Sequence, residues 1–470
     1  MVEEDMLIID TADKNPIYVQ IYQQIKNKIM SGELSAETRL SSVRELAVEL
    51  SISRNTVESA YQELIAEGYI HTRPRAGYFV SALDHNAASN IPRQTQHHEF
   101  TQPKDGLNFT YDFHPARLDP NSFPASLWRR IYTECLRESS GHLAQYSEPQ
   151  GEWELRSALQ KYLEQSRGVV CAPDQIVICA GLQHSLDIVA HLLKNTHPVA
   201  AIEDPGYPLP WAVLRNHGFD IVPISVGHEG INIDKLKHSN SSLVYVTPSH
   251  QFPLGHVMPI GNRLRLIEWA KSRNNYIIED DYDSELRYLG KPIPSLQGLH
   301  PHGNIIYTGT FSKVFSPALR ISYMVLPPTL LHMYHEHFRN YQTTTSVIEQ
   351  KALARFMGQG HWDKHIRRVR TTYKKRQTLF ISSIDRHFGT LGHVTGYGAG
   401  LHVVLQLPNI ERSENQIIAR ARTMNINLFP FSETRTSGKQ VPTTLLLGFG
   451  GIAPEEIDAG IEQLFHVCFG

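Results

Sequence analysis

One lysine of this chain lies in a setting that favours covalent chemistry. Lys313 follows the apolar run 304–307 after a short stretch that carries the hydroxyls of Thr310 and Ser312, and Arg320 lies seven positions farther on. Desolvation beside a buried strand suppresses the charge of a lysine and makes its amine a nucleophile able to form a Schiff base. The hydroxyls and the guanidinium are groups that hold a phosphate. The competing interpretation is a surface turn with a solvated lysine.

Polar and aromatic residues follow three other apolar runs. A glycine that opens a helix follows the run 176–180, and helix amides behind a glycine cradle phosphate. An aromatic ring follows the run 199–202, and a carboxylate and a tyrosine follow the run 276–278. Such a carboxylate can pair with a protonated ring nitrogen, and the tyrosine can hydrogen-bond a phenolic oxygen. A solvated acidic turn is the alternative for residues 279–283, although unpaired charge is costly there. The residues concerned are Gly181, Leu182, Gln183, Tyr207, Asp280 and Tyr282.

A sheet is needed to bring these residues together, and the chain predicts one. From residue 108 onward, short runs rich in β-branched residues alternate with helical patterns. Buried parallel strands joined by helical crossovers have this pattern, and ligands gather at the carboxyl ends of such strands. The predicted fold class of this part is therefore α/β. The expected strands are 176–180, 199–202, 221–224, 243–246, 276–278 and 304–307.

The first eighty residues have a different pattern, of helices followed by a hairpin. Isoleucines recur every four positions within residues 16–31, which predicts an amphipathic helix that begins at Pro16. Ser42 and Glu45 form a capping box for a second helix, and Ser53 is a suitable N-cap for a third. The runs 69–73 and 78–80 predict a hairpin with arginines at its tip. This order of elements is that of a winged helix-turn-helix.

The third helix would carry the DNA contacts, since its N-terminal end presents side chains to base edges and backbone amides to phosphates. Residues 1–82 carry eight lysines and arginines against twelve acids, whereas DNA-binding modules are usually basic. The arginines nevertheless fall on the elements that would face the groove. The alternative is a small helical docking domain. The candidate DNA-binding residues are Ser42, Arg44, Arg54, Asn55, Thr56, Arg73, Arg75 and Gly77.

The chain of 470 residues divides into three parts. We expect a winged helix-turn-helix over residues 1–82, a flexible polar linker over residues 83–107 and the large domain over residues 108–470. Four widely spaced cysteines without a CxxC pair predict a reducing compartment and no metal site. With no signal peptide and no apolar run of membrane length, a cytoplasmic protein is expected.

Two parts of the sequence resemble known families. Three stretches within residues 40–70 match the running pattern of the GntR-type winged helix, with Ser41 where that family usually has proline. From about residue 108 to the C-terminus, the segment 247–255 and the stretch around Lys313 resemble fold-type I, pyridoxal-phosphate-dependent aminotransferases. The whole chain therefore resembles the MocR/GabR family of bacterial transcription regulators.

The resemblance implies a role for each residue around the cofactor, pyridoxal 5′-phosphate. Lys313 forms the Schiff base and Asp280 binds the pyridine nitrogen, with Asp281 as a rival because a slip of one residue would exchange them. Tyr282 holds the ring oxygen and Tyr207 stacks on the ring. The residues that hold the phosphate are Gly181, Leu182, Gln183, Ser312 and Arg320.

A homodimer is implied as well, because the sites of this fold lie at a subunit interface. His250 lies beside the cofactor, and Tyr146 is expected to reach the cofactor of the partner subunit in a head-to-tail, domain-swapped pair. The other expected partners are a double-stranded DNA operator with repeated half-sites and a small-molecule effector. No membrane partner is expected.

The arginine that clamps the substrate carboxylate in aminotransferases is missing, which favours a sensor over an enzyme. Residues 443–449, where the family places it, contain none. Residues 208–210 also lack the arginine of GABA-responsive members, so Arg435 is the nearest candidate. The hypothesis is that pyridoxal phosphate itself is sensed, as in PdxR-like members that control vitamin B6 synthesis. The alternatives are a GabR-like sensor of an amino compound through an external aldimine, an active aminotransferase with a DNA-binding head, and a scaffold with a vestigial lysine site.

Overall fold

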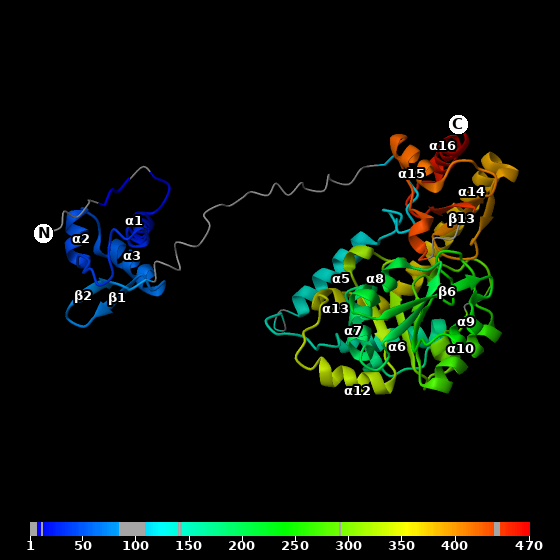
Figure 1. The fold of residues 1–470 in the computed structure, drawn as a ribbon, viewed down its shortest axis with the longest axis horizontal. Helices are drawn as coiled ribbons and strands as arrows, with labels where there is room; N and C mark the ends of the chain where they lie inside the picture. The colour runs from blue at the N-terminus through cyan, green and yellow to red at the C-terminus, as the bar shows by residue number, and fades with distance from the viewer. Residues whose placement is uncertain are drawn as a thin grey trace. The chain divides into compact units, whose positions relative to one another are not determined.

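The computed structural model describes residues 7–10, 13–83, 109–139, 141, 143–290, 293–436 and 442–470. The chain forms two compact units, Met1–Gly106 and Leu107–Gly470 (Figure 1). The predicted linker, residues 83–107, lies outside the described residues apart from Leu83. Within the described ranges, no helix has both the length and the apolar character needed to cross a membrane.

The N-terminal unit is the predicted winged helix-turn-helix. Its capping box is present, since Glu45 donates its amide N–H to Ser42 Oγ at 3.2 Å and accepts the amide N–H of Ser42 at 2.8 Å. Ser53 Oγ likewise accepts the amide N–H of Thr56 at 3.2 Å, which fixes the start of the third helix. The apolar faces of the helices and the hairpin meet in one core. The elements are α1 (Ile17–Ser31), α2 (Val43–Glu49), α3 (Arg54–Ala66), β1 (Ile70–Arg73) and β2 (Gly77–Val80).

The second unit is built on an eight-stranded sheet. In spatial order its strands are β4 (Ile176–Cys179), β11 (Ser322–Val325), β10 (Ile305–Thr310), β9 (Tyr276–Asp281), β8 (Leu243–Val246), β5 (Val199–Asp204), β6 (Asp220–Gly227) and β7 (Gly230–Ile231). The neighbours β10, β9, β8, β5 and β6 run parallel, as the α/β pattern predicted.

The sequence did not predict β11, which runs antiparallel to both β10 and β4. The chain passes from β10 to β11 through residues 311–321, without a helical crossover, so the spacing of strand and helix that marks a parallel strand is absent here. This direct connection carries Lys313 and places it at the carboxyl end of β10.

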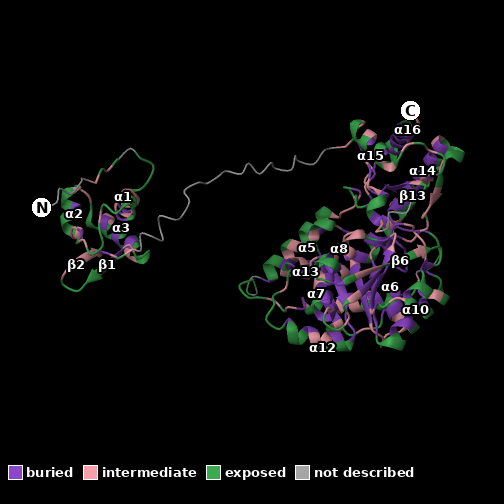
Figure 2. Cartoon of the chain, viewed as in Figure 1, coloured by how far each residue is buried: buried purple, intermediate pink, exposed green. Residues whose placement is uncertain are grey.

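Alternate residues of the central strands enter different cores. Ile176 and Ile178 of β4 pack in one apolar cluster, whereas Val177 and Cys179 pack in another. Helices therefore cover both faces of the sheet, and Figure 2 shows the buried sheet within this more exposed shell. These helices are α5 (Ala125–Glu138), α6 (Trp153–Arg167), α7 (Leu182–Leu193), α8 (Pro208–Asn216), α9 (Ile233–His238), α10 (Ile260–Arg273), α11 (Leu296–Leu299), α12 (Pro328–His337) and α13 (Val347–Gly358).

A smaller antiparallel sheet forms the C-terminal part of the same unit, orange to red in Figure 1. Its strands are β12 (His393–Thr395), β13 (His402–Leu407) and β15 (Thr443–Gly448), and its helices are α14 (His361–Phe388), α15 (Glu414–Thr423) and α16 (Ile457–Phe469). The pairing of β14 (Ile426–Asn427) with β3 (Tyr111–Asp112) joins the first strand of the unit to this part.

Candidate cofactor and DNA-binding sites

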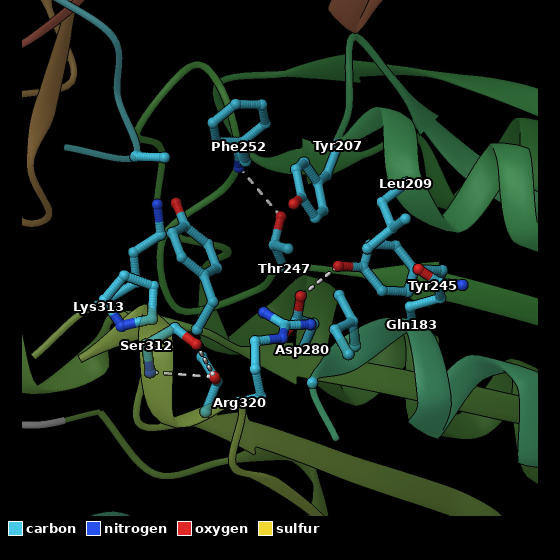
Figure 3. Close-up of a pocket in the computed structure, with 16 residues that line it drawn as sticks. Gln183, Tyr207, Leu209, Tyr245, Thr247, Phe252, Asp280, Ser312, Lys313 and Arg320 are labelled. Atoms are coloured by element: carbon cyan, nitrogen blue, oxygen red, sulfur yellow. Dashed lines mark hydrogen bonds between the residues drawn. The ribbon is translucent and has the colours of Figure 1, made fainter. Parts of the chain in front are cut away.

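A cavity of about 330 Å³ lies at the carboxyl ends of β4, β8, β9 and β10 (Figure 3). All but two of the predicted cofactor residues line it, and the two exceptions are His250 and Tyr146. The lining residues that sequence reasoning had proposed are Gly181, Leu182, Gln183, Tyr207, Asp280, Tyr282, Thr310, Ser312, Lys313 and Arg320. Those that it had not proposed are Ala116, Leu209, Tyr245, Thr247, Phe252 and Pro317.

One end of the cavity is suited to a phosphate. Gly181 precedes α7 with a φ of 92°, and its carbon lies so close to the guanidinium of Arg320 that an added Cβ would overlap Arg320 Nη2. Arg320 donates to the carbonyl of Ala180 at 3.2 Å. Ser312 accepts from Thr310 Oγ1 at 3.0 Å, which gathers two hydroxyls beside the arginine. Hydroxyls, a guanidinium and a helix N-terminus form a donor set for an oxyanion.

Lys313 lies in the turn after β10 and lines the same cavity (Figure 3). Its Nζ donates to the carbonyl of Pro115 at 3.3 Å. Burial lowers the pKa of Lys313, although Asp283 and Asp280 oppose the shift. The amine is therefore more readily deprotonated than a surface lysine, as a nucleophile requires.

The acidic run after β9 is a buried cluster and not a solvated turn. Asp280 lines the cavity and accepts a hydrogen bond from the hydroxyl of Tyr245 (Figure 3). It accepts a second one from the hydroxyl of Thr308. Burial raises the pKa of Asp280 to about 7. Asp281 points to the opposite face of the strand, where Arg167 Nε donates to it at 2.6 Å and the Tyr307 hydroxyl at 2.5 Å. A paired Asp281 leaves Asp280 as the carboxylate of the cavity.

His250 does not line the cavity but contacts Tyr282, which does. It is buried, with Nδ1 at 2.8 Å from Asp283 Oδ2 and 3.0 Å from the hydroxyl of Tyr282. The motif 247–255, singled out in the sequence, thus contributes Thr247 and Phe252 to the lining and His250 to the layer that positions Tyr282. Tyr207 packs its ring against Phe252, with centroids 5.4 Å apart.

Tyr146 does not line this cavity, and the residue is 88% exposed. Arg435 does not line it either. Its neighbour Thr434 contacts the turn that carries the lining residue Tyr207, because the Thr434 carbonyl accepts the amide N–H of Gly206 at 2.8 Å. Among the described lining residues, the charged ones are Asp280, Lys313 and Arg320.

In the N-terminal unit, the predicted DNA residues differ in how they are held. Arg44, Arg54, Asn55 and Arg75 are exposed, and no carboxylate of the described residues forms an ion pair with these arginines. Arg73 pairs with Glu37 and covers the ring of Phe79 at 4.6 Å. The remaining three shape the backbone, since Ser42 and Thr56 belong to helix caps and Gly77 has a φ of 107°.

Comparisons with known proteins agree with this geometry. Residues 17–80 match the family of bacterial regulatory proteins of the gntR type, and residues 118–464 match aminotransferase class I and II. The chain is 40% identical to the uncharacterized HTH-type transcriptional regulator YdeL of Bacillus subtilis over 96% of each chain. It is 34% identical to the probable rhizopine catabolism regulatory protein MocR of Rhizobium meliloti, over 98% of this chain and 95% of that one. The chain belongs to the MocR family of GntR-type transcription regulators.

A more distant regulator and a solved structure are similar as well. The pyridoxine biosynthesis transcriptional regulator PdxR of Corynebacterium glutamicum is 27% identical over 94% of each chain. The crystal structure of an archaeal alanine:glyoxylate aminotransferase has the fold of the second unit, with a TM-score of 0.71 at 23% identity, and covers 78% of this chain and 92% of its own. The second unit of this MocR-type regulator therefore has the fold of class I and II aminotransferases, and members of that family use pyridoxal phosphate.

The cavity of this regulator fits that cofactor. A side chain at Gly181 would fill the place of the Arg320 guanidinium, so the glycine keeps an anion-binding corner open. The lining also contains a buried carboxyl group, that of Asp280, and one amine, that of Lys313, which are the groups that would hold the ring nitrogen and the aldehyde of pyridoxal phosphate. Sequence reasoning missed Tyr245, because its place in the buried strand 243–246 gave no sign that its hydroxyl reaches Asp280.

Proposed function

We propose that this regulator binds pyridoxal 5′-phosphate in the cavity of the aminotransferase-like unit. Arg320, Ser312 and the start of α7 would hold the phosphate, and Asp280 would keep the ring nitrogen protonated. When bound, the cofactor supplies an aldehyde carbon that a primary amine attacks, and Lys313 is the amine of the cavity. The lowered pKa of Lys313 supports this role.

The effector is proposed to be pyridoxal phosphate itself, with the genes of vitamin B6 biosynthesis as the target. The observation that carries this proposal is the charge of the cavity wall: among its described lining residues, Arg320 is the sole arginine, and it lies at the phosphate end. Where GABA-responsive members have an arginine, Leu209 lines the cavity. An amino-acid carboxylate therefore lacks the forked partner that aminotransferases give it. The similarity to PdxR supports the same target.

The test is a titration of pyridoxal phosphate into the apo-protein while binding to a DNA fragment selected for this protein is followed. We expect a change in affinity or footprint that saturates together with the visible absorbance of the bound cofactor. Lys313→Ala should lose both the absorbance and the response. Identical DNA binding with and without saturating pyridoxal phosphate would sink the proposal that it is the effector.

A second candidate is a regulator that senses an amino compound through the bound cofactor. The identity to the probable rhizopine catabolism regulatory protein MocR, 34% against 27% for PdxR, favours an effector other than pyridoxal phosphate. In that case DNA binding by the cofactor-loaded protein should respond to a primary amine and not to pyridoxal phosphate alone. Multiple turnovers of transamination would instead identify a working aminotransferase.

The active form is proposed to be a head-to-tail homodimer that presents two winged helices to repeated half-sites. Tyr146 supports this arrangement, because a tyrosine exposed to 88% contributes little to its own subunit and is free to approach a partner's cavity. Tyr146→Ala should weaken cofactor binding without changing the thermal stability of the isolated chain. Equal cofactor affinity in the variant would remove Tyr146 from the site.

A further inference from the structure

A second cavity of about 330 Å³ lies away from the first and shares no lining residue with it. It opens between the end of α6, the short 3-10 helix η2 (Ser284–Leu286) that follows the acidic run, and the first turns of α14. The lining residues that matter here are Tyr162, Ser166, Arg167, Glu285, Arg367 and Arg370.

One wall of this second cavity is a buried acid with an unused oxygen. Glu285 is 8% exposed, and its Oε1 accepts a hydrogen bond from the hydroxyl of Tyr162 at 2.9 Å. Its Oε2 has no hydrogen-bond partner among the described residues, and neither has Ser166 Oγ. Buried polar atoms without partners are rare in folded proteins because each loses its hydration without compensation. Both atoms are therefore available to a hydrogen-bonding ligand in the cavity.

Another part of the lining is a pair of arginines three residues apart on one face of α14. Arg370 donates its Nε to the carbonyl of Glu285 at 2.7 Å, which orients the guanidinium and leaves its two terminal nitrogens without partners in the described part of the chain. Arg367 is exposed and forms no ion pair with any described residue, Asp363 one turn earlier included. Two adjacent guanidiniums form a fork for a carboxylate or a phosphate.

We propose that this second cavity binds a small ligand that carries an oxyanion at one end and a charged hydrogen-bond donor, an ammonium group, at the other. The oxyanion lies between Arg367 and Arg370. The ammonium donates to Glu285 Oε2 and to the hydroxyl oxygen of Ser166. Such a ligand neutralises the charges of the two arginines and fills the unused bonding capacity of the buried Glu285 carboxyl group.

The second cavity is linked to the first through one side chain. Arg167 lines the second cavity and holds Asp281 through two hydrogen bonds, of 2.6 Å and 3.2 Å. Asp281 is the chain neighbour of Asp280 on β9, and Glu285 follows four residues later. The segment 280–285 therefore contributes lining residues to both cavities. The inference does not depend on the cofactor proposed for the first cavity.

The experiment is isothermal titration calorimetry on the full chain carrying Lys313→Ala, prepared without pyridoxal phosphate, so that amines do not react at the first cavity. The probes are β-alanine and O-phosphoethanolamine, which have an ammonium group with a carboxylate or a phosphate, and propionate, which lacks the ammonium. We expect at least one of the first two to bind, and propionate to bind at least about tenfold more weakly. The preferred probe identifies the oxyanion. Absence of binding by both, or equal binding of propionate, overturns the proposal.

Two substitutions locate the binding. Arg367→Gln removes an exposed guanidinium, so the variant should fold normally. Its affinity for the preferred probe should be about tenfold lower. Lys374→Gln removes one charge from the exposed face of the same helix, outside the cavity, and serves as the matched control. Glu285→Gln should weaken the ammonium-bearing probes and leave propionate unchanged. Equal effects of Arg367→Gln and Lys374→Gln would show that binding is a general response to charge and would overturn the site.

Discussion

Replacing Gly181 by alanine tests the phosphate end of the first cavity most directly. Gly181 has a φ of 92° and a ψ of 168°, a backbone conformation that residues with a Cβ rarely adopt. The added Cβ would overlap Arg320 Nη2 and lie 3.0 Å from its Cζ. The backbone strain should lower the free energy of unfolding by about 1–3 kcal/mol. The guanidinium can relieve the overlap only by turning away, which breaks its hydrogen bond to the Ala180 carbonyl.

The displaced guanidinium sets the expected loss of cofactor affinity. A hydrogen bond to a charged group contributes about 1.5–3 kcal/mol, so the dissociation constant of pyridoxal phosphate should rise roughly 10- to 150-fold. The assay is a titration of the apo-protein followed by visible absorbance, with a thermal melt of the same sample. Gly261→Ala is the matched control, because Gly261 lies within α10 and no atom beyond its own helix backbone and chain neighbours comes within 4 Å of an added Cβ there.

A double variant separates backbone strain from the loss of the arginine. In an Arg320→Ala background, Gly181→Ala keeps its strain but has no guanidinium to displace. The second substitution should then lower the melting temperature without weakening pyridoxal phosphate binding further. Wild-type cofactor affinity in Gly181→Ala alone, or a full additional loss in the double variant, would refute the placement of Arg320 at the phosphate.

Three further predictions concern the acids of β9 and the DNA-binding helix. Burial raises the pKa of Asp280 to about 7, so the folded apo-protein holds this proton more tightly than the unfolded chain and loses stability as pH rises from about 4 to about 7. The melting temperature of Asp280→Asn should therefore exceed that of the wild type at about pH 8 but not at about pH 4. Asp281→Asn leaves Arg167 buried and unpaired, so urea unfolding should show a loss of about 3–5 kcal/mol; a loss below about 1 kcal/mol, the range of an exposed pair, would contradict this account. Arg54→Gln should weaken binding to selected DNA in a gel-shift assay at an unchanged melting temperature, and unaltered DNA affinity would remove Arg54 from the interface.

Much of the protein was predictable because its signals are local. The capping box of Ser42 and Glu45 needs only a spacing of three residues, and the structure contains it. The strand-end residues were predictable for a related reason. Parallel strands bring their carboxyl ends to one edge, so Gly181, Asp280 and Lys313 had to meet once the strands were assigned.

Other features depended on contacts between distant parts of the chain. The sequence left Asp280 and Asp281 interchangeable, and the choice came from Arg167, which lies 114 residues before Asp281 and pairs with it on the far face of the sheet. The strand β11 was missed because its antiparallel pairing removes the crossover helix that marks its neighbours.

The second cavity had no signal in the sequence at all. Nothing in the sequence distinguishes its acid and its arginines from other charged residues. They come together only in the fold, where Arg370 donates to the carbonyl of Glu285, 85 residues earlier in the chain. The sequence by itself determined which residues cap helices and end strands, since those are properties of neighbours along the chain. Only the tertiary structure decided which side chains share a cavity, because burial and charge pairing arise between segments that meet when the sheet and its helices pack.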